Sequence, residues 1–153
     1  MLLRTHLAVS LFFILLLFQQ VQNPVLFAIV CLIATAIPDI DTKHSKIGHH
    51  NLFRIFNLFS RHRGMIHSFS ILAVISIALF LFYKEILFPF ALGYSLHLIA
   101  DAVTLNGIIP FYPLKFKIRG KIRTGGIIEN FLFIIFFVSD LILLFSKIYL
   151  ISK

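Results

Sequence analysis

Long runs of apolar residues, separated by short polar stretches, cover most of the chain. The clear runs lie at 7–21, 68–83, 86–104 and 127–151, and a shorter one lies at 25–37. A run of about 17 to 25 apolar residues can cross a bilayer as an α-helix. The pattern therefore predicts an all-α integral membrane protein with one domain and about five transmembrane helices. The predicted helices are 7–22, 24–38, 66–84, 86–104 and 127–151, with loops at 39–65 and 105–126 within the domain 1–153.

The two long loops carry different polar patterns. Polar residues recur about every third position at 51–61, which is typical of an amphipathic helix lying in the headgroup layer. From Lys115 to Arg123, basic residues alternate with mostly apolar ones. This period of two predicts a short basic β-ribbon or loop that turns near Gly120 on the membrane surface.

Composition and charge indicate a membrane protein and predict its orientation in the membrane. The chain is 59% hydrophobic and 13% charged, with a mean hydropathy of +0.99, whereas soluble domains are about 25% charged. If the helices alternate in direction, the N-terminus and both long loops share one face, and of the 14 basic residues only Lys84, Lys147 and Lys153 lie elsewhere. The positive-inside rule makes this face cytoplasmic, in a cell or inner membrane. We expect the basic residues to meet membrane lipids rather than nucleic acid, because no DNA-binding motif accompanies them.

The chain has seven histidines, and they lie with most of the carboxylates on that same face. His97 and Asp101 are four residues apart, so they lie on one side of the last turns of their helix. Ionisable groups in membrane segments are costly, and a bound ion can offset the cost. We therefore expect a metal site at the cytoplasmic interface. Its candidate ligands are His6, Asp39, Asp41, His62, His67, His97, Asp101 and Glu129.

The donor types indicate the chemistry. Imidazole and carboxylate together suit zinc better than calcium or magnesium, and the number of donors allows two or more ions. A metal site of this kind activates water and stabilises the oxygens of a phosphoester, which predicts hydrolysis. Glu129 and Asp41 are both candidates for the general base, depending on which one does not bind the metal. Arg63, beside Gly64, is the candidate for binding a substrate phosphate.

These motifs resemble those of the YdjM family, in the same order, between about residues 5 and 135. The resemblance implies a membrane-bound metal-dependent hydrolase with an association to LexA binding. It also implicates Ser68 and Thr104, which we expect to contact substrate with Arg63. Ile66 stands where the family often has threonine, so a hydroxyl contact is absent there. The matching motifs are Thr5-His6, Pro38-Asp39-Ile40-Asp41, His62-Arg63-Gly64-x-x-His67-Ser68, Gly93-Tyr94-x-x-His97-x-x-x-Asp101-x-x-Thr104-x-x-Gly107 and Glu129.

Two functional hypotheses stay open from the sequence. The first is a metal-dependent hydrolase acting on a phosphoester or ester of a lipid. The second is a non-catalytic membrane protein whose structural metal site supports docking of a cytoplasmic regulatory protein. A metal transporter is a weaker hypothesis, because transporter sites commonly lie near the middle of the membrane. Any single interfacial histidine or aspartate is more often a helix cap or a solvated group, so the metal-site prediction rests on the whole set.

Overall fold

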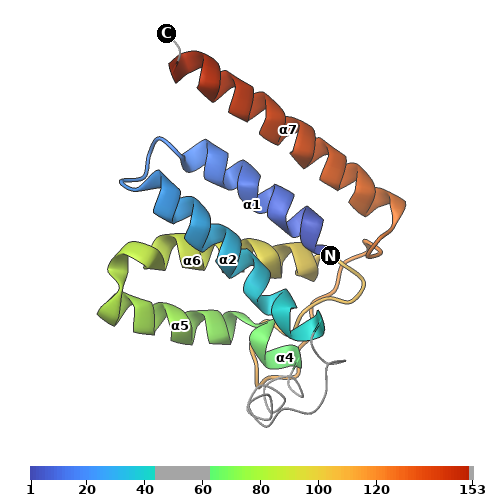
Figure 1. Ribbon diagram of the computed structural model, residues 1–153. Helices are drawn as coiled ribbons and strands as arrows, with labels where there is room; N and C mark the ends of the chain where they lie inside the picture. Colours follow the sequence, from blue (N-terminus) through green and yellow to red (C-terminus); the bar gives the residue numbers. More distant parts are fainter. Residues whose placement is uncertain (44–62, 152–153) are drawn as a thin grey trace.

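The computed structural model describes residues 1–43 and 63–151 of the 153-residue chain, with side chains at 1–39 and 65–149. Each apolar segment of the sequence contains one long helix, so the all-α class is confirmed (Figure 1). The amphipathic helix predicted at 51–61 lies outside the described residues. The helices are α1 (Leu3–Leu17), α2 (Pro24–Lys43), α4 (Arg63–Ile66), α5 (Phe69–Phe82), α6 (Lys84–Ala102) and α7 (Ile127–Ile151).

A polar turn joins α1 and α2 into an antiparallel hairpin (Figure 1). The side chain of Asn23 accepts a hydrogen bond of 3.2 Å from the backbone N–H of Leu26 and so caps α2. Pro24 occupies the first helical position, where its missing N–H costs no intrahelical hydrogen bond. Along the hairpin, Ile14 of α1 packs with Phe27 of α2 in an apolar cluster.

α2 lies very close to α6 because Gly93 of α6 has no side chain. A Cβ at Gly93 would be 2.2 Å from the carbonyl oxygen of Cys31. The Thr35 hydroxyl lies in the same contact, 2.8 Å from the Cys31 carbonyl and 2.7 Å from the Ser10 hydroxyl of α1. Small residues and hydroxyls at helix crossings are typical of membrane proteins. This contact places the end of α2 beside the end of α6, where candidate ligands lie.

α5 packs antiparallel to α6 around a buried aromatic residue. Tyr94 is buried with Leu72 and Leu98 in one apolar cluster. The Tyr94 hydroxyl donates a hydrogen bond of 2.5 Å to the carbonyl of Ile66, at the end of α4. The turn that contains His67 is therefore attached to α6.

α7 leans against α1 and is otherwise apart from the bundle (Figure 1). The rings of Phe12 and Phe136 meet edge to face, with centroids 5.5 Å apart. One turn later Asp140 is 4% exposed, and neither of its carboxyl oxygens has a hydrogen-bond partner among the described residues. An unpartnered carboxyl group in an apolar helix is expected to be protonated.

One helix in the described part of the chain is long and apolar enough to cross a membrane. It is the part of α7 from Ile127 to Tyr149, with 23 residues and a mean hydropathy of 2.4. The apolar helices Leu3–Leu17, Pro24–Asp39 and Phe69–Phe82 are shorter. A helix of 15 residues is only about 22 Å long, less than the hydrocarbon thickness of about 30 Å. Five membrane-spanning helices are thus not established by helix length.

The basic segment 115–123 differs from the predicted ribbon. It pairs with the chain just after α6 instead of with itself, through isolated bridges between Thr104 and Ile122 and between Ile108 and Ile118. The described residues form no extended strand there. The reason is a close backbone approach: a Cβ at Gly107, whose φ is +61°, would be 2.1 Å from the carbonyl oxygen of Ile118. Glycine permits both this φ and this distance, so the segment is a loop attached to the end of α6.

Candidate metal centre

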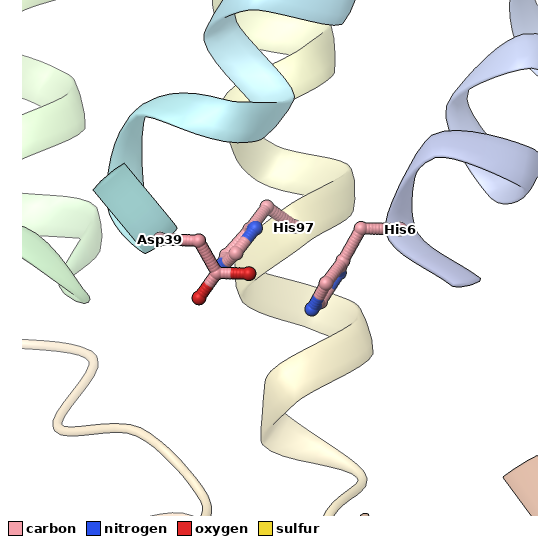
Figure 2. A group of neighbouring side chains, drawn as sticks. All are labelled: His6, Asp39 and His97. Carbon is pink, nitrogen blue, oxygen red and sulfur yellow. The ribbon is translucent and has the colours of Figure 1, made fainter. Parts of the chain in front are cut away.

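Five helix ends meet at one end of the bundle, where most of the predicted ligands lie. The N-terminal ends of α1, α5 and α7 approach the C-terminal ends of α2 and α6 there (Figure 1). Figure 2 shows His6 of α1, Asp39 of α2 and His97 of α6 pointing toward one another. The antiparallel order of the helices produces this meeting, because alternate ends of consecutive helices must lie on the same side.

Two overlapping groups of side chains could hold a metal ion. In the first, one donor atom each from His6, Asp39 and His97 lies within 4.8 Å of the others. The second group satisfies the same limit with His67, His97 and Asp101. His97 belongs to both groups. The two groups are therefore parts of one centre, made from four separate segments of the chain.

The imidazole rings are tightly packed around His97. The rings of His6 and His97 are stacked, with centroids 4.0 Å apart and an angle of 14° between the planes. The ring of His67 approaches His97 edge to face at 5.4 Å. All three rings lie beside the Asp101 carboxylate: its oxygens are 3.5 Å from Nε2 of His97 and 3.7 Å from Nε2 of His67.

A backbone contact determines which nitrogen of His97 is free. Nδ1 of His97 is 2.8 Å from the carbonyl oxygen of Thr35. A carbonyl only accepts, so Nδ1 carries the hydrogen and Nε2 presents its lone pair to the centre. Metal-binding histidines are commonly oriented by such a second hydrogen bond. Sequence reasoning missed this contact, because the group involved is a backbone carbonyl and any residue could supply it.

Several buried nitrogens in the centre lack hydrogen-bond partners among the described residues: both ring nitrogens of His6 and Nε2 of His97. Nε2 of His6 is 3.2 Å from an oxygen of Asp101, but the alignment is not that of a hydrogen bond. Leaving a buried polar atom unsatisfied costs about 1–3 kcal/mol. A cation bound by the lone pair of one His6 nitrogen and by that of Nε2 of His97 would remove much of that cost, so the donor set fits a metal.

Burial disfavours the charged form of the His67 imidazole. Loss of hydration lowers the pKa of His67, and the nearby His97 lowers it further. A neutral imidazole is the form that binds a metal. The terminal ammonium of Met1 contacts an oxygen of Asp101, so a positive group already lies at this carboxylate.

Glu129 lies beside the centre but belongs to neither donor group. Its side chain is fully buried. One oxygen accepts hydrogen bonds from the backbone N–H of Leu2 at 2.5 Å and from the Thr5 hydroxyl at 3.0 Å. The other accepts from the N–H of Gly125 at 2.6 Å. Glu129 thus connects the first turn of α1, which contains His6, to the start of α7, while its metal-binding and general-base roles stay predictions.

The other predicted site residues fall into two classes. Ser68 is buried and caps α5, accepting a hydrogen bond from the N–H of Ile71 at 3.3 Å. Thr104 is also buried, and its hydroxyl donates to the carbonyl of Asp101 at 2.8 Å. Both hydroxyls thus bind backbone next to the centre, and their substrate contacts stay predictions. The side chains of Asp41, His62 and Arg63 lie outside the described part of the structure, so their roles stay predictions as well.

A cavity of about 510 Å³ opens beside the centre. Asp39, His67 and Asp101 line one part of it. Met1 and the chain after α6 supply the rest of the lining, which includes Asn106, Lys117 and Thr124. Sequence reasoning did not single out these three residues, although Lys117 belongs to the basic segment that it did recognise.

Comparison with known proteins assigns the family. No curated protein and no solved structure matches the chain. The family model described as YdjM inner membrane protein matches residues 1–151, a range that contains every element and candidate ligand described above. The resemblance noted in the sequence motifs is therefore confirmed. The chain belongs to the YdjM inner membrane protein family.

Proposed function

We propose that this protein is a membrane-bound metal-dependent hydrolase that cleaves a phosphoester or ester of a lipid at the cytoplasmic face. The observation that supports it most is the meeting of three imidazoles and two carboxylates beside a cavity of about 510 Å³. Metal centres that hydrolyse phosphoesters require this combination of clustered donors and an adjoining space for substrate.

The donor set favours zinc. His6, Asp39 and His97 would hold one ion, and His67 and Asp101 would complete the centre. Because Nδ1 of His97 donates to the Thr35 carbonyl, only Nε2 of this histidine can bind a metal. The two donor groups would therefore hold either one ion or two closely spaced ions. A mixed set of imidazole and carboxylate ligands suits zinc in both cases.

The components of the site would have separate roles in the proposed reaction. A bound metal would supply an activated water and stabilise negative charge on the substrate. The Asp101 carboxylate, whose oxygens lie 3.2 to 3.7 Å from Nε2 of three imidazoles, would bind the metal together with those rings. The cavity admits the scissile group, and Asp41 or Glu129 would accept the proton from water.

The surroundings of the cavity support a lipid substrate. Ile109 lines the cavity, and the neighbouring Leu105 and Phe111 are exposed at 52% and 54%. Exposed apolar side chains of this size next to a polar cavity are suited to contact acyl chains. The basic residues from Lys115 to Arg123 lie on the same side as the centre, which supports a cytoplasmic location.

Metal content is the first test. Elemental mass spectrometry on the detergent-purified protein should find bound metal, and the double variant Asp39→Ala/Asp101→Ala should lose it. Glu85→Gln, an exposed carboxylate in the first turn of α6, is the matched control and should retain it. A folded wild type without metal would contradict the proposal.

Turnover separates the two functional hypotheses. With metal established, the protein is assayed on phosphorylated and ester lipids with that metal. Hydrolysis that disappears in the double variant supports the enzyme. Bound metal without hydrolysis, combined with a lower melting temperature after chelation, would instead favour a structural metal and a docked cytoplasmic partner.

A further inference from the structure

The loop after α6 gives its part of the cavity lining a chemical character of its own. Asp39, His67 and Asp101 line the cavity from the helix ends, and the chain between α6 and α7 contributes Asn106, Lys117 and Thr124. Lys117 is the only lysine or arginine among the described lining residues, and the terminal ammonium of Met1, which contacts Asp101, also lines the cavity. The cavity lining therefore combines a lysine and uncharged polar groups from the loop with the candidate metal ligands from the helix ends.

The position of Lys117 is determined by backbone pairing. Its neighbour Ile118 exchanges two hydrogen bonds of 2.9 Å with Ile108. A side chain at Gly107 or Gly120 would prevent the approach, because a Cβ there would be 2.1 Å from a backbone oxygen of the opposite segment. The loop is thus attached to the end of α6, the helix that also contains His97 and Asp101, so Lys117 has a fixed place relative to the centre.

Lys117 is exposed, and no salt bridge joins it to a carboxylate in residues 1–39 and 65–149. Asp101, one of the two carboxylates that line the cavity, is instead beside imidazoles and the terminal ammonium. An ammonium group and neighbouring amide and hydroxyl donors are suited to bind phosphate oxygens.

We propose that Lys117, with Asn106 and Thr124, forms a subsite that binds the phosphate group of a phosphorylated ligand above the metal ligands. This inference rests on the proposed function, since it names the substrate class of that same site. It also assigns different tasks to the basic residues of the loop. Lys115, Arg119, Lys121 and Arg123 are exposed like Lys117 but do not line the cavity, so they would contact anionic headgroups from outside.

Direct binding tests the subsite without requiring turnover. The protein is purified in a maltoside detergent, which contains no phosphate, and titrated calorimetrically with short-chain phosphatidic acid and with inorganic phosphate. Lys117→Ala should weaken binding by about tenfold or more, equivalent to one strong charged hydrogen bond. Lys115→Ala, the matched control, should change affinity by less than about twofold, because this exposed charge does not line the cavity. Metal content should be unchanged in both variants.

The two probes distinguish the sources of the phosphate. Parallel losses for both would show recognition of the phosphate group itself, whereas binding of phosphatidic acid alone would show that the lipid portion is required. Equal affinities in wild type and Lys117→Ala, an equal loss in Lys115→Ala, or no binding of either probe would overturn the subsite. Metal-free wild type that still binds phosphate through Lys117 would reject the hydrolase and keep the subsite.

Discussion

At the scale of single residues, the environment of the His97 side chain gives the strongest argument for a metal site. One nitrogen donates to the Thr35 carbonyl at 2.8 Å, and the other is buried without a hydrogen-bond partner among the described residues. His6 stacks on its ring at 4.0 Å. Two buried aromatic rings with unsatisfied nitrogens would be unfavourable in a centre without a cation. Their free lone pairs explain why the sequence places histidine here rather than an apolar residue.

Replacement of His97 should therefore remove metal more completely than replacement of His67. His97 belongs to both donor groups, whereas His67 belongs to one. Changes to groups that only orient a ligand cost about 10- to 100-fold in metal affinity, so His97→Ala should exceed that range. Metal affinity is measured by competition with a chelator. Glu85→Gln, an exposed carboxylate in the first turn of α6 and at the other end of that helix from His97, serves as control. Equal affinities in His97→Ala and His67→Ala would contradict the shared centre.

The hydrogen bonds of Glu129 favour a role in positioning the first turn of α1 against the start of α7. Glu129→Gln should lower the stability of the protein by about 1–3 kcal/mol, because an amide NH₂ would face a backbone N–H and leave it unsatisfied. The two oxygens now accept from Leu2, Thr5 and Gly125. Thermal unfolding in detergent measures the change.

The control for Glu129 is its neighbour Asn130, whose side chain accepts from Arg4 at an exposed position. Asn130→Ala should leave the melting temperature nearly unchanged. If Glu129→Gln unfolds at the wild-type temperature but has lost its metal, Glu129 is a ligand and the positioning role is wrong.

At the scale of elements, the loop after α6 is as important as the helices. The five helix ends supply the candidate ligands, but the loop supplies Asn106, Lys117 and Thr124 to the cavity lining. It is held by backbone hydrogen bonds such as the one from Gly120 to Thr104 at 2.9 Å. Since backbone pairing requires close approach, the glycines in this loop determine whether the wall forms.

Two glycines with the same backbone conformation test this role. Gly107 and Gly125 have φ values of 61° and 73°, so alanine should cost about 1–2 kcal/mol of strain at either position. Only the Cβ at Gly107 would collide, 2.1 Å from the Ile118 oxygen, whereas that at Gly125 meets open space. Gly107→Ala should therefore lower the melting temperature further and weaken phosphate binding. Identical melting temperatures and affinities in the two variants would show that the close approach is unimportant.

At the scale of the whole molecule, the helices differ in length around a common end. α1 and α5 contain 15 and 14 residues, whereas α7 contains 25, which corresponds to about 22, 21 and 37 Å. The shorter helices would require local thinning of the bilayer or would place the centre below the headgroups. Either arrangement brings the metal ligands close to the ester region of the lipids, which agrees with the proposed substrate.

Chemical labelling can test the orientation of the molecule in the membrane. A cysteine at Lys121, in the basic loop, should react with a membrane-impermeant maleimide only from the cytoplasmic side, because the positive-inside rule places the loop there. A cysteine at Gln22, in the turn at the opposite end of α1, should react only from the other side. Both positions are exposed, and the native Cys31 is fully buried. Labelling of both from one side would contradict the helix arrangement, and the reversed pattern would contradict the cytoplasmic location.

The sequence by itself determined the helices and the face on which the candidate ligands lie. Apolar runs, the polar turn before Pro24 and the i,i+4 spacing of His97 and Asp101 are local features, so they can be recognised without the fold. Alternation of the helices then placed the ligand-bearing ends together. The residue types His and Asp also indicated a metal, because few other uses justify so many of them in an apolar chain.

Only the tertiary structure decided which atoms meet. The Thr35 carbonyl that orients His97, the backbone donors that occupy Glu129, and the pairing of the basic segment with the end of α6 all join residues distant in the chain. The alternating pattern from Lys115 to Arg123 predicted a ribbon, but the pattern cannot specify its pairing partner. Such contacts depend on how closely helices and loops approach, which is set by packing over the whole molecule rather than by neighbouring residues.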